Sequence, residues 1–228
     1  VDPVWSRIIS AKDAAGARDR SLAVTGGLHR RRWMSGGCAM PLICGDEHPT
    51  VVIPGAFPAE ICAQLLLETD ALTLGSAEIL GSERLDWRAS QTAFLPADHW
   101  AATAMAQLIA FANSSVGWNY DVSNPENPQF AAYGVGEHYD WHVDCCTRGD
   151  TVRKITAVLQ LDETDDYAGG DLEFRRLEEP DERLDGPPEL RDQGTVVVFP
   201  SYLVHRVTPV TRGTRRSLAM WMTGPRFR

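Results

Sequence analysis

The sequence has no apolar run that approaches the roughly 18 residues of a membrane-spanning helix, and its first residues lack the continuous apolar core of a signal peptide. It also has few cysteines: Cys38, Cys44, Cys62, Cys145 and Cys146 are odd in number and show no Cys-x-x-Cys spacing. This pattern favours neither a disulfide framework nor a zinc site. We therefore expect a cytoplasmic protein with free thiols and no membrane partner.

Positive charge is also scarce. The chain holds 22 Lys and Arg against 31 Asp and Glu, which gives a formal net charge of −9. Nucleic acids and anionic membrane surfaces need clustered positive charge, and the one basic run, at residues 30–32, is typical of a surface turn. The composition thus predicts no nucleic-acid partner and leaves the oligomeric state open.

A chain of 228 residues is long enough for one sizeable core. Residues 1–47 are rich in Ala, Gly and Arg, and we expect an N-terminal extension with a short helix followed by an irregular segment. The domain proper should span residues 48–228. A short strand is expected at 50–53 and a helix from Pro58, which suits a first helical turn. A second helix is expected from His99 to about Asn113, capped by Asp98.

Short strands and turns dominate the chain from residue 129 onward, a pattern typical of a sandwich or barrel. A charged loop is expected at 178–192. The predicted fold class is mainly β with flanking helices, in a double-stranded β-helix of the jelly-roll or cupin-like kind. The strands are predicted at 129–135, 139–144, 152–161, 171–177, 195–199, 203–207 and 214–223.

Two of these strands carry residues that could bind a metal ion. His142 and Asp144 are two residues apart in an extended segment, so their side chains should face the same side. An imidazole and a carboxylate are two of the three ligands that hold non-haem Fe(II) on one face. After a β-branched run and a Pro-Ser-Tyr turn, His205 can return beside this pair as the third ligand.

Three motifs extend this pattern. Tyr-x2-Gly-x2-Tyr-x2-His-x-Asp runs from Tyr133 to Asp144, Gly169-Gly170-Asp171-Leu172 follows, and His-x-Val-x-Pro-Val-x-x-Gly-x-Arg runs from His205 to Arg215. In this order and spacing they resemble the Fe(II)- and 2-oxoglutarate-dependent dioxygenases, in the prolyl-4-hydroxylase-like, PKHD-type branch. The resemblance covers the chain from about residue 48 to its end.

The resemblance implies that His142, Asp144 and His205 are the catalytic iron ligands. It further implies that 2-oxoglutarate is bound by Arg215, whose guanidinium matches a carboxylate, with help from Tyr133, Ser217 and Gln160. Gln160 departs from the tyrosine that some relatives have at this position, although an amide can donate the same hydrogen bond. Arg216 should face the other side of its strand as a solvated or loop-anchoring charge.

Three further residues are candidates for substrate contact. Tyr139 is on the opposite parity to His142 and needs a bend to point inward. Trp221 should either close the pocket or belong to the core. Arg153 is by default an exposed strand arginine. The loop at 74–84 is a candidate substrate lid by resemblance.

The expected activity is hydroxylation of an unactivated C–H bond in an amino acid, a peptidyl residue or a natural-product intermediate, with release of succinate and CO2. The cofactors implied are Fe(II), 2-oxoglutarate as cosubstrate and dioxygen, with ascorbate as a reductant. Two alternatives remain open: a metal-binding jelly-roll module without turnover, and a metal-dependent hydrolase, which would need neither Arg215 nor the Gly169-Gly170 step. The sequence does not indicate which substrate is used.

Overall fold

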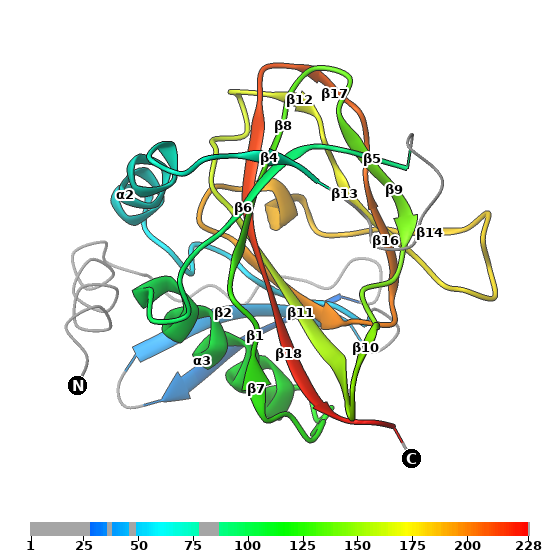
Figure 1. The fold of residues 1–228 in the computed structure, drawn as a ribbon. Helices are drawn as coiled ribbons and strands as arrows, with labels where there is room; N and C mark the ends of the chain where they lie inside the picture. The colour runs from blue at the N-terminus through cyan, green and yellow to red at the C-terminus, as the bar shows by residue number, and fades with distance from the viewer. Residues whose placement is uncertain (1–27, 36–37, 46–48, 78–86, 228) are drawn as a thin grey trace.

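The computed structural model describes residues 28–35, 38–45, 49–77 and 87–227. The predicted short helix before residue 28 and most of the candidate lid at 74–84 lie outside this part of the chain. Two antiparallel sheets face each other across the interior (Figure 1), and two helices cover the outer side of the larger sheet. The predicted class, mainly β with flanking helices, is confirmed.

The larger sheet has the strand order β1-β2-β3-β15-β11-β18-β8-β6-β4, with β10 beside β11 and β7 beside β18. Its strands are β1 Leu28–Ser35, β2 Cys38–Gly45, β3 Val51–Ile53, β4 Gly75–Ser76, β6 Gln91–Phe94, β7 Asn124–Pro125, β8 Gln129–Tyr133, β10 Thr147–Arg148, β11 Thr151–Gln160, β15 Val196–Pro200 and β18 Arg215–Pro225.

The smaller sheet has the order β14-β13-β16-β9-β5, and β12 and β17 form a separate pair. The strands are β5 Arg88–Ala89, β9 His138–His142, β13 Leu172–Arg175, β14 Arg183–Leu184, β16 Val204–Val207, β12 Ala168–Gly169 and β17 Val210–Arg212. All seven strands predicted between residues 129 and 223 are present, with ends shifted by two residues or fewer.

The alternation of side chains along β11 explains why the site lies between the sheets. Ala157 and Leu159 pack in the cluster that includes both helices, while Val158 packs with residues of the smaller sheet such as Phe174. Because successive side chains point to opposite faces, Thr156 and Gln160 share the inner face with Val158. The large sheet therefore presents its polar side chains to the space between the sheets.

Helix α2 (Ala59–Asp70) begins directly after Pro58, as predicted. Helix α3 (Trp100–Ser115) is capped by His99, whose Nδ1 accepts a hydrogen bond from the amide of Ala101 at 3.2 Å. The prediction that Asp98 caps this helix is wrong, because His99 occupies the cap position.

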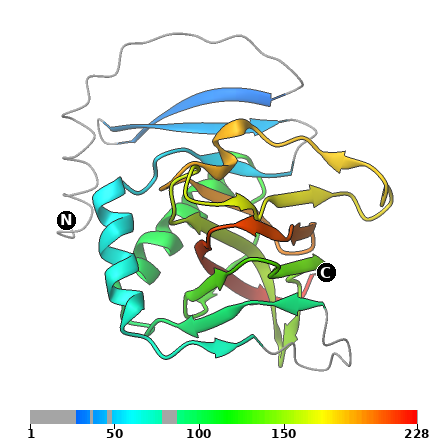
Figure 2. The same ribbon diagram turned by 90° about the horizontal axis from the view of Figure 1, so that it is seen from above.

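The N-terminal extension contains a hairpin of β1 and β2 that continues the large sheet through β3 (Figure 2). The prediction of an irregular segment is wrong for these residues. Leu42 and Ile43 are buried, so the apolar run in β2 covers an edge of β3 that would otherwise be open. The division between extension and domain at residues 47 and 48 stays a prediction.

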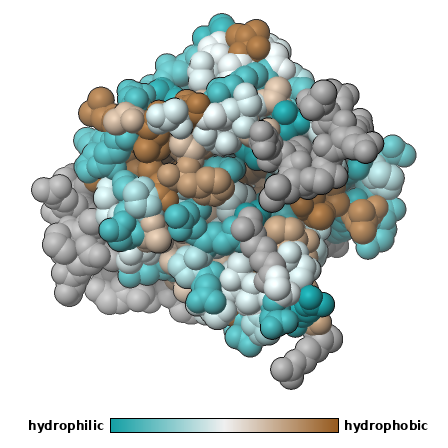
Figure 3. Space-filling model, in the orientation of Figure 1, coloured by the Kyte–Doolittle hydropathy of each residue, from teal (hydrophilic) through white to brown (hydrophobic). Residues whose placement is uncertain are grey.

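Figure 3 shows hydrophilic and apolar residues mixed over one face of the molecule. No helix in the described part of the chain is long and apolar enough to cross a membrane. The loop at 178–192, predicted as a surface connection, contains β14 and a short 3-10 helix, η1 (Pro188–Arg191), whose Leu190 is buried. This helix reaches the interior, where it contacts the site described next.

Candidate active site

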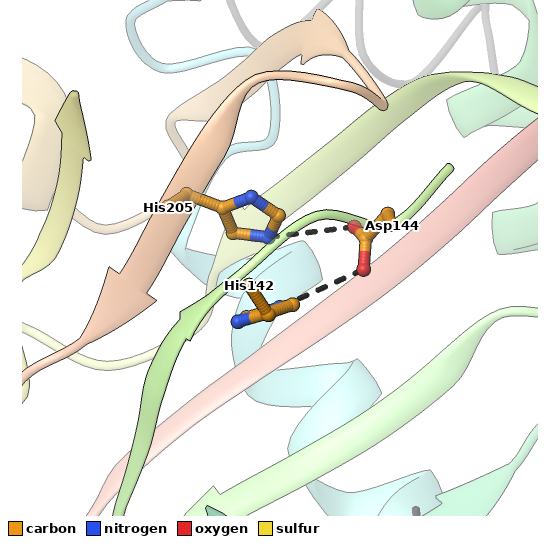
Figure 4. A group of neighbouring side chains, drawn as sticks. All are labelled: His142, Asp144 and His205. Carbon is orange, nitrogen blue, oxygen red and sulfur yellow. Dashed lines mark ion pairs between the residues drawn. The ribbon is translucent and has the colours of Figure 1, made fainter. Parts of the chain in front are cut away.

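The three predicted metal ligands converge between the sheets (Figure 4). His142 ends β9, and His205 lies directly opposite it on β16. Asp144 lies two residues beyond β9, where its amide donates to the carbonyl of Ser201 at 2.8 Å. Its carboxylate oxygens lie 3.6 Å from His142 Nε2 and 3.4 Å from His205 Nε2. All three ligand atoms lie within 4.8 Å of one another.

Backbone carbonyls fix the orientation of both imidazoles. His142 Nδ1 lies 2.7 Å from the carbonyl oxygen of Asp140, and His205 Nδ1 lies 2.9 Å from that of Leu203. A carbonyl only accepts, so each Nδ1 carries the proton and donates. Each Nε2 is thereby left with its lone pair facing Asp144, which is the tautomer that a metal ion requires.

The electrostatics of the triad favour a neutral His142 and an ionised Asp144. Burial, followed by the proximity of His205, lowers the pKa of His142 from 6.5 to about 3. Burial alone would raise the pKa of Asp144, but the two imidazoles and the indole of Trp221 hold it well below its usual value. Two imidazoles and one carboxylate match the donor set of a non-haem Fe(II) centre.

Asp144 is held from behind by neutral donors. Its Oδ2 accepts from the indole N–H of Trp221 at 2.8 Å and from the hydroxyl of Thr156 at 3.0 Å, and Thr156 also contacts Ser201 at 2.9 Å. Trp221, predicted as a substrate contact or a core residue, thus contacts the carboxylate directly. These bonds orient the carboxylate and leave Oδ1 for a metal.

Arg153, predicted as an exposed strand arginine, is only 11% exposed at its side chain, where it forms an ion pair with Glu126. The two side chains are joined by bonds of 2.7 and 2.6 Å. The guanidinium lies 3.8 Å from the ring centre of Trp221. Arg153 therefore buttresses the tryptophan that holds Asp144, and its charge is already balanced.

Tyr139 points inward despite its parity. Its ring stacks on His142 with centroids 3.5 Å apart and an interplanar angle of 12°, at a place where the register between β9 and β16 shifts. The guanidinium of Arg88 also lies over this ring, 4.6 Å from its centre. Burial raises the pKa of Tyr139 to about 12, so the phenol stays protonated.

The predicted cosubstrate anchor, Arg215, is 1% exposed. Its guanidinium donates to the side-chain oxygen of Gln160 at 2.9 Å and to the hydroxyl of Ser217 at 3.3 Å, and lies 5.6 Å from the ring centre of Tyr133. Its Nε has no hydrogen-bond partner. Within the described residues, no carboxylate forms an ion pair with it. A buried cation of this kind needs an anion.

The neighbouring arginine behaves differently, as the strand parity predicts. Arg216 pairs with the buried carboxylate of Asp162, through Nε at 2.8 Å and through Nη2 at 2.5 Å. Asp162 lies just beyond the end of β11 and anchors this stretch of the strand pair. Arg216 is thus satisfied by the protein itself, while Arg215 is not.

The Gly169-Gly170 step makes room for Arg215. Both glycines have positive φ angles, and a Cβ on Gly170 would lie 2.9 Å from Cδ of Arg215 and 3.0 Å from Cγ2 of Val210. Any side chain at residue 170 would therefore displace the guanidinium stem, in addition to the backbone strain.

Four residues that contact the site residues were not predicted: Thr156 behind Asp144, Glu126 beside Arg153, Arg88 over Tyr139, and Leu190, whose carbonyl accepts a hydrogen bond from Gln160. Thr156 did leave a signal, because a polar residue within the apolar run of β11 must find a buried partner. The others lie far from the motifs in sequence and have no local signature.

Comparisons with known proteins agree with this geometry. The 2OG-Fe(II) oxygenase superfamily matches residues 128–223, the part of the chain that holds the triad and Arg215. Over these residues the chain is similar to the 2OG-Fe(II) oxygenase superfamily, and this match together with the triad supports an oxygenase. A PKHD-type hydroxylase of Xanthomonas campestris pv. campestris (strain 8004) is 28% identical over 177 residues, 72% of this chain and 74% of the relative.

Solved structures show the same fold. A Pseudomonas putida prolyl-4-hydroxylase is 25% identical, with a TM-score of 0.60 over 79% of this chain and 95% of that one. A Trichoplax adhaerens prolyl hydroxylase, in complex with a hypoxia inducible factor oxygen degradation domain peptide fragment, has a TM-score of 0.59 at 18% identity, over 78% and 84% of the two chains. The oxygenase has the predicted double-stranded β-helix. The findings support an Fe(II)- and 2-oxoglutarate-dependent hydroxylase, and not the two alternatives, a metal-binding module without turnover and a metal-dependent hydrolase.

Proposed function

We propose that His142, Asp144 and His205 hold Fe(II), and that Arg215 binds the far carboxylate of 2-oxoglutarate in the same space between the sheets. The observation that carries this proposal is a cluster of two imidazoles and one carboxylate, combined with a buried arginine that has no carboxylate partner among the described residues. Each end is incomplete in the described protein, and a metal ion chelated by a dicarboxylate completes both.

The residues of the triad and those around Arg215 would bind the metal and the cosubstrate in different ways. The Nε2 atoms of His142 and His205 offer lone pairs, and Oδ1 of Asp144 offers negative charge. Ser217 and Tyr133 shape the pocket around Arg215. When bound, Fe(II) with 2-oxoglutarate and dioxygen supplies the oxidative chemistry that releases succinate and CO2 and oxidises a C–H bond.

The surrounding residues keep this set rigid. Trp221 and Thr156 hold Asp144 in place, so the carboxylate remains bound and leaves no vacancy for a halide. Hydroxylation is therefore favoured over halogenation. The ring of Tyr139 covers one face of His142, which fixes the imidazole and excludes water from that side.

For the substrate we propose an amino acid or a peptidyl residue, ahead of a natural-product intermediate. The support is the similarity of this chain to hydroxylases. One of its structural neighbours, a prolyl hydroxylase, was solved in complex with a peptide fragment. Of the predicted substrate contacts, Tyr139 and Trp221 touch the triad directly, whereas Arg153 lies against Trp221 and is paired with Glu126. The requirement for ascorbate and the cytoplasmic location remain predictions.

The test is succinate formation from 2-oxoglutarate with added Fe(II), in air and without oxygen. The substrates would be a panel of amino acids and peptides, with mass spectrometry for a product that has gained one oxygen atom. We expect oxygen-dependent succinate that is stimulated by at least one member of the panel and is absent with Asp144→Ala. Equal succinate from Asp144→Ala and the native protein would contradict the proposal.

A further inference from the structure

Gln160 lies at the end of β11, 2% exposed, and bonds both to Arg215 and to the backbone of Leu190. Its side-chain oxygen accepts from Arg215 at 2.9 Å, and its side-chain nitrogen donates to the carbonyl of Leu190 at 3.1 Å. The expected donation from this amide to 2-oxoglutarate stays a prediction, since the nitrogen has a second N–H group.

The partners fix which way the amide faces. A guanidinium can only donate, and a backbone carbonyl can only accept. Turning the amide over would place a donor against Arg215 and an acceptor against the Leu190 carbonyl. Gln160 therefore presents its oxygen to the arginine.

We infer that Gln160 is a positioning residue for Arg215: its neutral oxygen holds the guanidinium in place without neutralising it, and so keeps the cation available for the cosubstrate. The inference rests on the proposed binding of 2-oxoglutarate by Arg215. A carboxylate in the same place would form an internal ion pair with the guanidinium, which is stronger than a bond to a neutral oxygen. The far carboxylate of 2-oxoglutarate would then compete with the protein's own charge.

The inference also gives the loop at 186–192 a part in cosubstrate binding. Leu190 holds Gln160, and the next residue, Arg191, donates to the carbonyl of Gly169 at 3.2 Å and pairs with the carboxylate of Asp171. Gly169 precedes the glycine that lies against Arg215. The short helix η1 thus supports the arginine from two sides.

The direct test is Gln160→Glu, measured by calorimetric titration of 2-oxoglutarate into the anaerobic protein loaded with Mn(II). At about pH 8.5 a carboxyl group beside a guanidinium is ionised. We expect the affinity to fall on the order of a hundredfold, as for other changes to a buried charge pair. Mn(II) affinity should be unchanged, because the metal ligands are untouched.

A second variant separates positioning from simple packing. Gln160→Met keeps the volume and removes both hydrogen bonds but adds no charge, so we expect a loss of only about fivefold, of the size that one or two neutral hydrogen bonds give. Its effect should appear in KM for 2-oxoglutarate, with kcat little changed. A merely structural role predicts the opposite order, with methionine at least as harmful as glutamate.

Gln193→Glu is the matched control. Gln193 is half-buried and also donates to a backbone carbonyl, that of Leu161 at 2.8 Å, but it does not contact Arg215. This variant should bind 2-oxoglutarate as the native protein does. Affinity for Gln160→Glu within about threefold of native, or a larger loss for Gln160→Met, would overturn the inference.

Arg215→Ala distinguishes a failure of the proposed cosubstrate site from a failure of the positioning role of Gln160. If it does not weaken 2-oxoglutarate binding, the proposed cosubstrate site is wrong. If it weakens binding but Gln160→Glu does not, only the positioning role fails. Adding Gln160→Glu to Arg215→Ala should cause no further loss, because the new carboxylate then has no cation to neutralise.

Discussion

The two ends of the site hold charges of opposite sign, and each charge is held by neutral hydrogen-bond partners. At the triad, Asp144 accepts hydrogen bonds from Trp221 and Thr156, both neutral, and faces the imidazoles of His142 and His205. At the other end, Arg215 is held by Gln160 and Ser217, again neutral. The first end keeps a negative charge that needs a cation, and the second keeps a positive charge that needs an anion.

Two other arginines near the site are paired with carboxylates of the protein itself. Arg216 has Asp162, and Arg153 has Glu126. A charge that is oriented but not neutralised is costly without a ligand. The comparison teaches that the position of a ligand can be recognised from charges that the protein holds in place with neutral partners only.

The largest expected effect is at the negative end. His142→Ala, Asp144→Ala and His205→Ala should each abolish turnover and weaken Fe(II) binding, because each removes one of three ligands. His138→Ala is the control, since His138 lies on the same strand but outside the triad. Metal titration by calorimetry and succinate assays would check this, and loss of metal in the His138 variant alone would overturn the ligand assignment.

The next effect contrasts the two adjacent arginines. Arg215→Ala should raise the 2-oxoglutarate requirement by an amount corresponding to about 2–5 kcal/mol, the cost of losing a charge-assisted pair in a closed pocket. Arg216→Ala should instead lower the free energy of unfolding by about 3 kcal/mol, because Asp162 is left buried without its ion pair.

Binding calorimetry and urea unfolding of both arginine variants would separate the two effects. Equal changes in 2-oxoglutarate affinity would mean that the assignment of the two arginines to opposite faces of β18 carries no functional difference.

A smaller effect on metal affinity is expected at Trp221, which donates a hydrogen bond to the predicted metal ligand Asp144. Trp221→Phe keeps the ring that Arg153 covers but removes the N–H that orients Asp144, so metal affinity should fall about 10- to 100-fold. Trp100→Phe is the matched control, because its indole also donates to a carboxylate, that of Glu68 at 3.2 Å, on the helical side of the molecule. Similar metal affinity in both variants would show that the bond to Asp144 has no effect on the metal.

The last effect concerns the metal-free protein and pH. His142 has a pKa of about 3 in the folded chain against 6.5 for the free side chain, so between these values the unfolded state binds more protons. Stability should therefore fall as the pH decreases from about 6.5 towards 3. His142→Asn should flatten this dependence in urea unfolding at several pH values, and an unchanged slope would contradict the role given to burial.

Much of this site was predictable from sequence because its residues follow the strand period. His142 and Asp144 share a face, and Arg215 and Ser217 share another, so parity alone brought each pair together. The inward position of Tyr139 could not be predicted from strand parity, because it depends on a register shift between β9 and β16. The contact of Gln160 with Leu190 depends on a short helix inside a charged, proline-rich loop, where local sequence gives no inward-facing pattern.

The central claim is that one metal-bound dicarboxylate completes both ends of the site. A crystal structure of the protein with Mn(II) and 2-oxoglutarate, grown without oxygen, tests it most directly. We predict the metal on Nε2 of His142, Nε2 of His205 and the carboxylate of Asp144, with the far carboxylate of 2-oxoglutarate on Arg215. A metal bound by other residues, or a carboxylate held by Arg153 or Arg216 while Arg215 stays without an anion, would contradict the account.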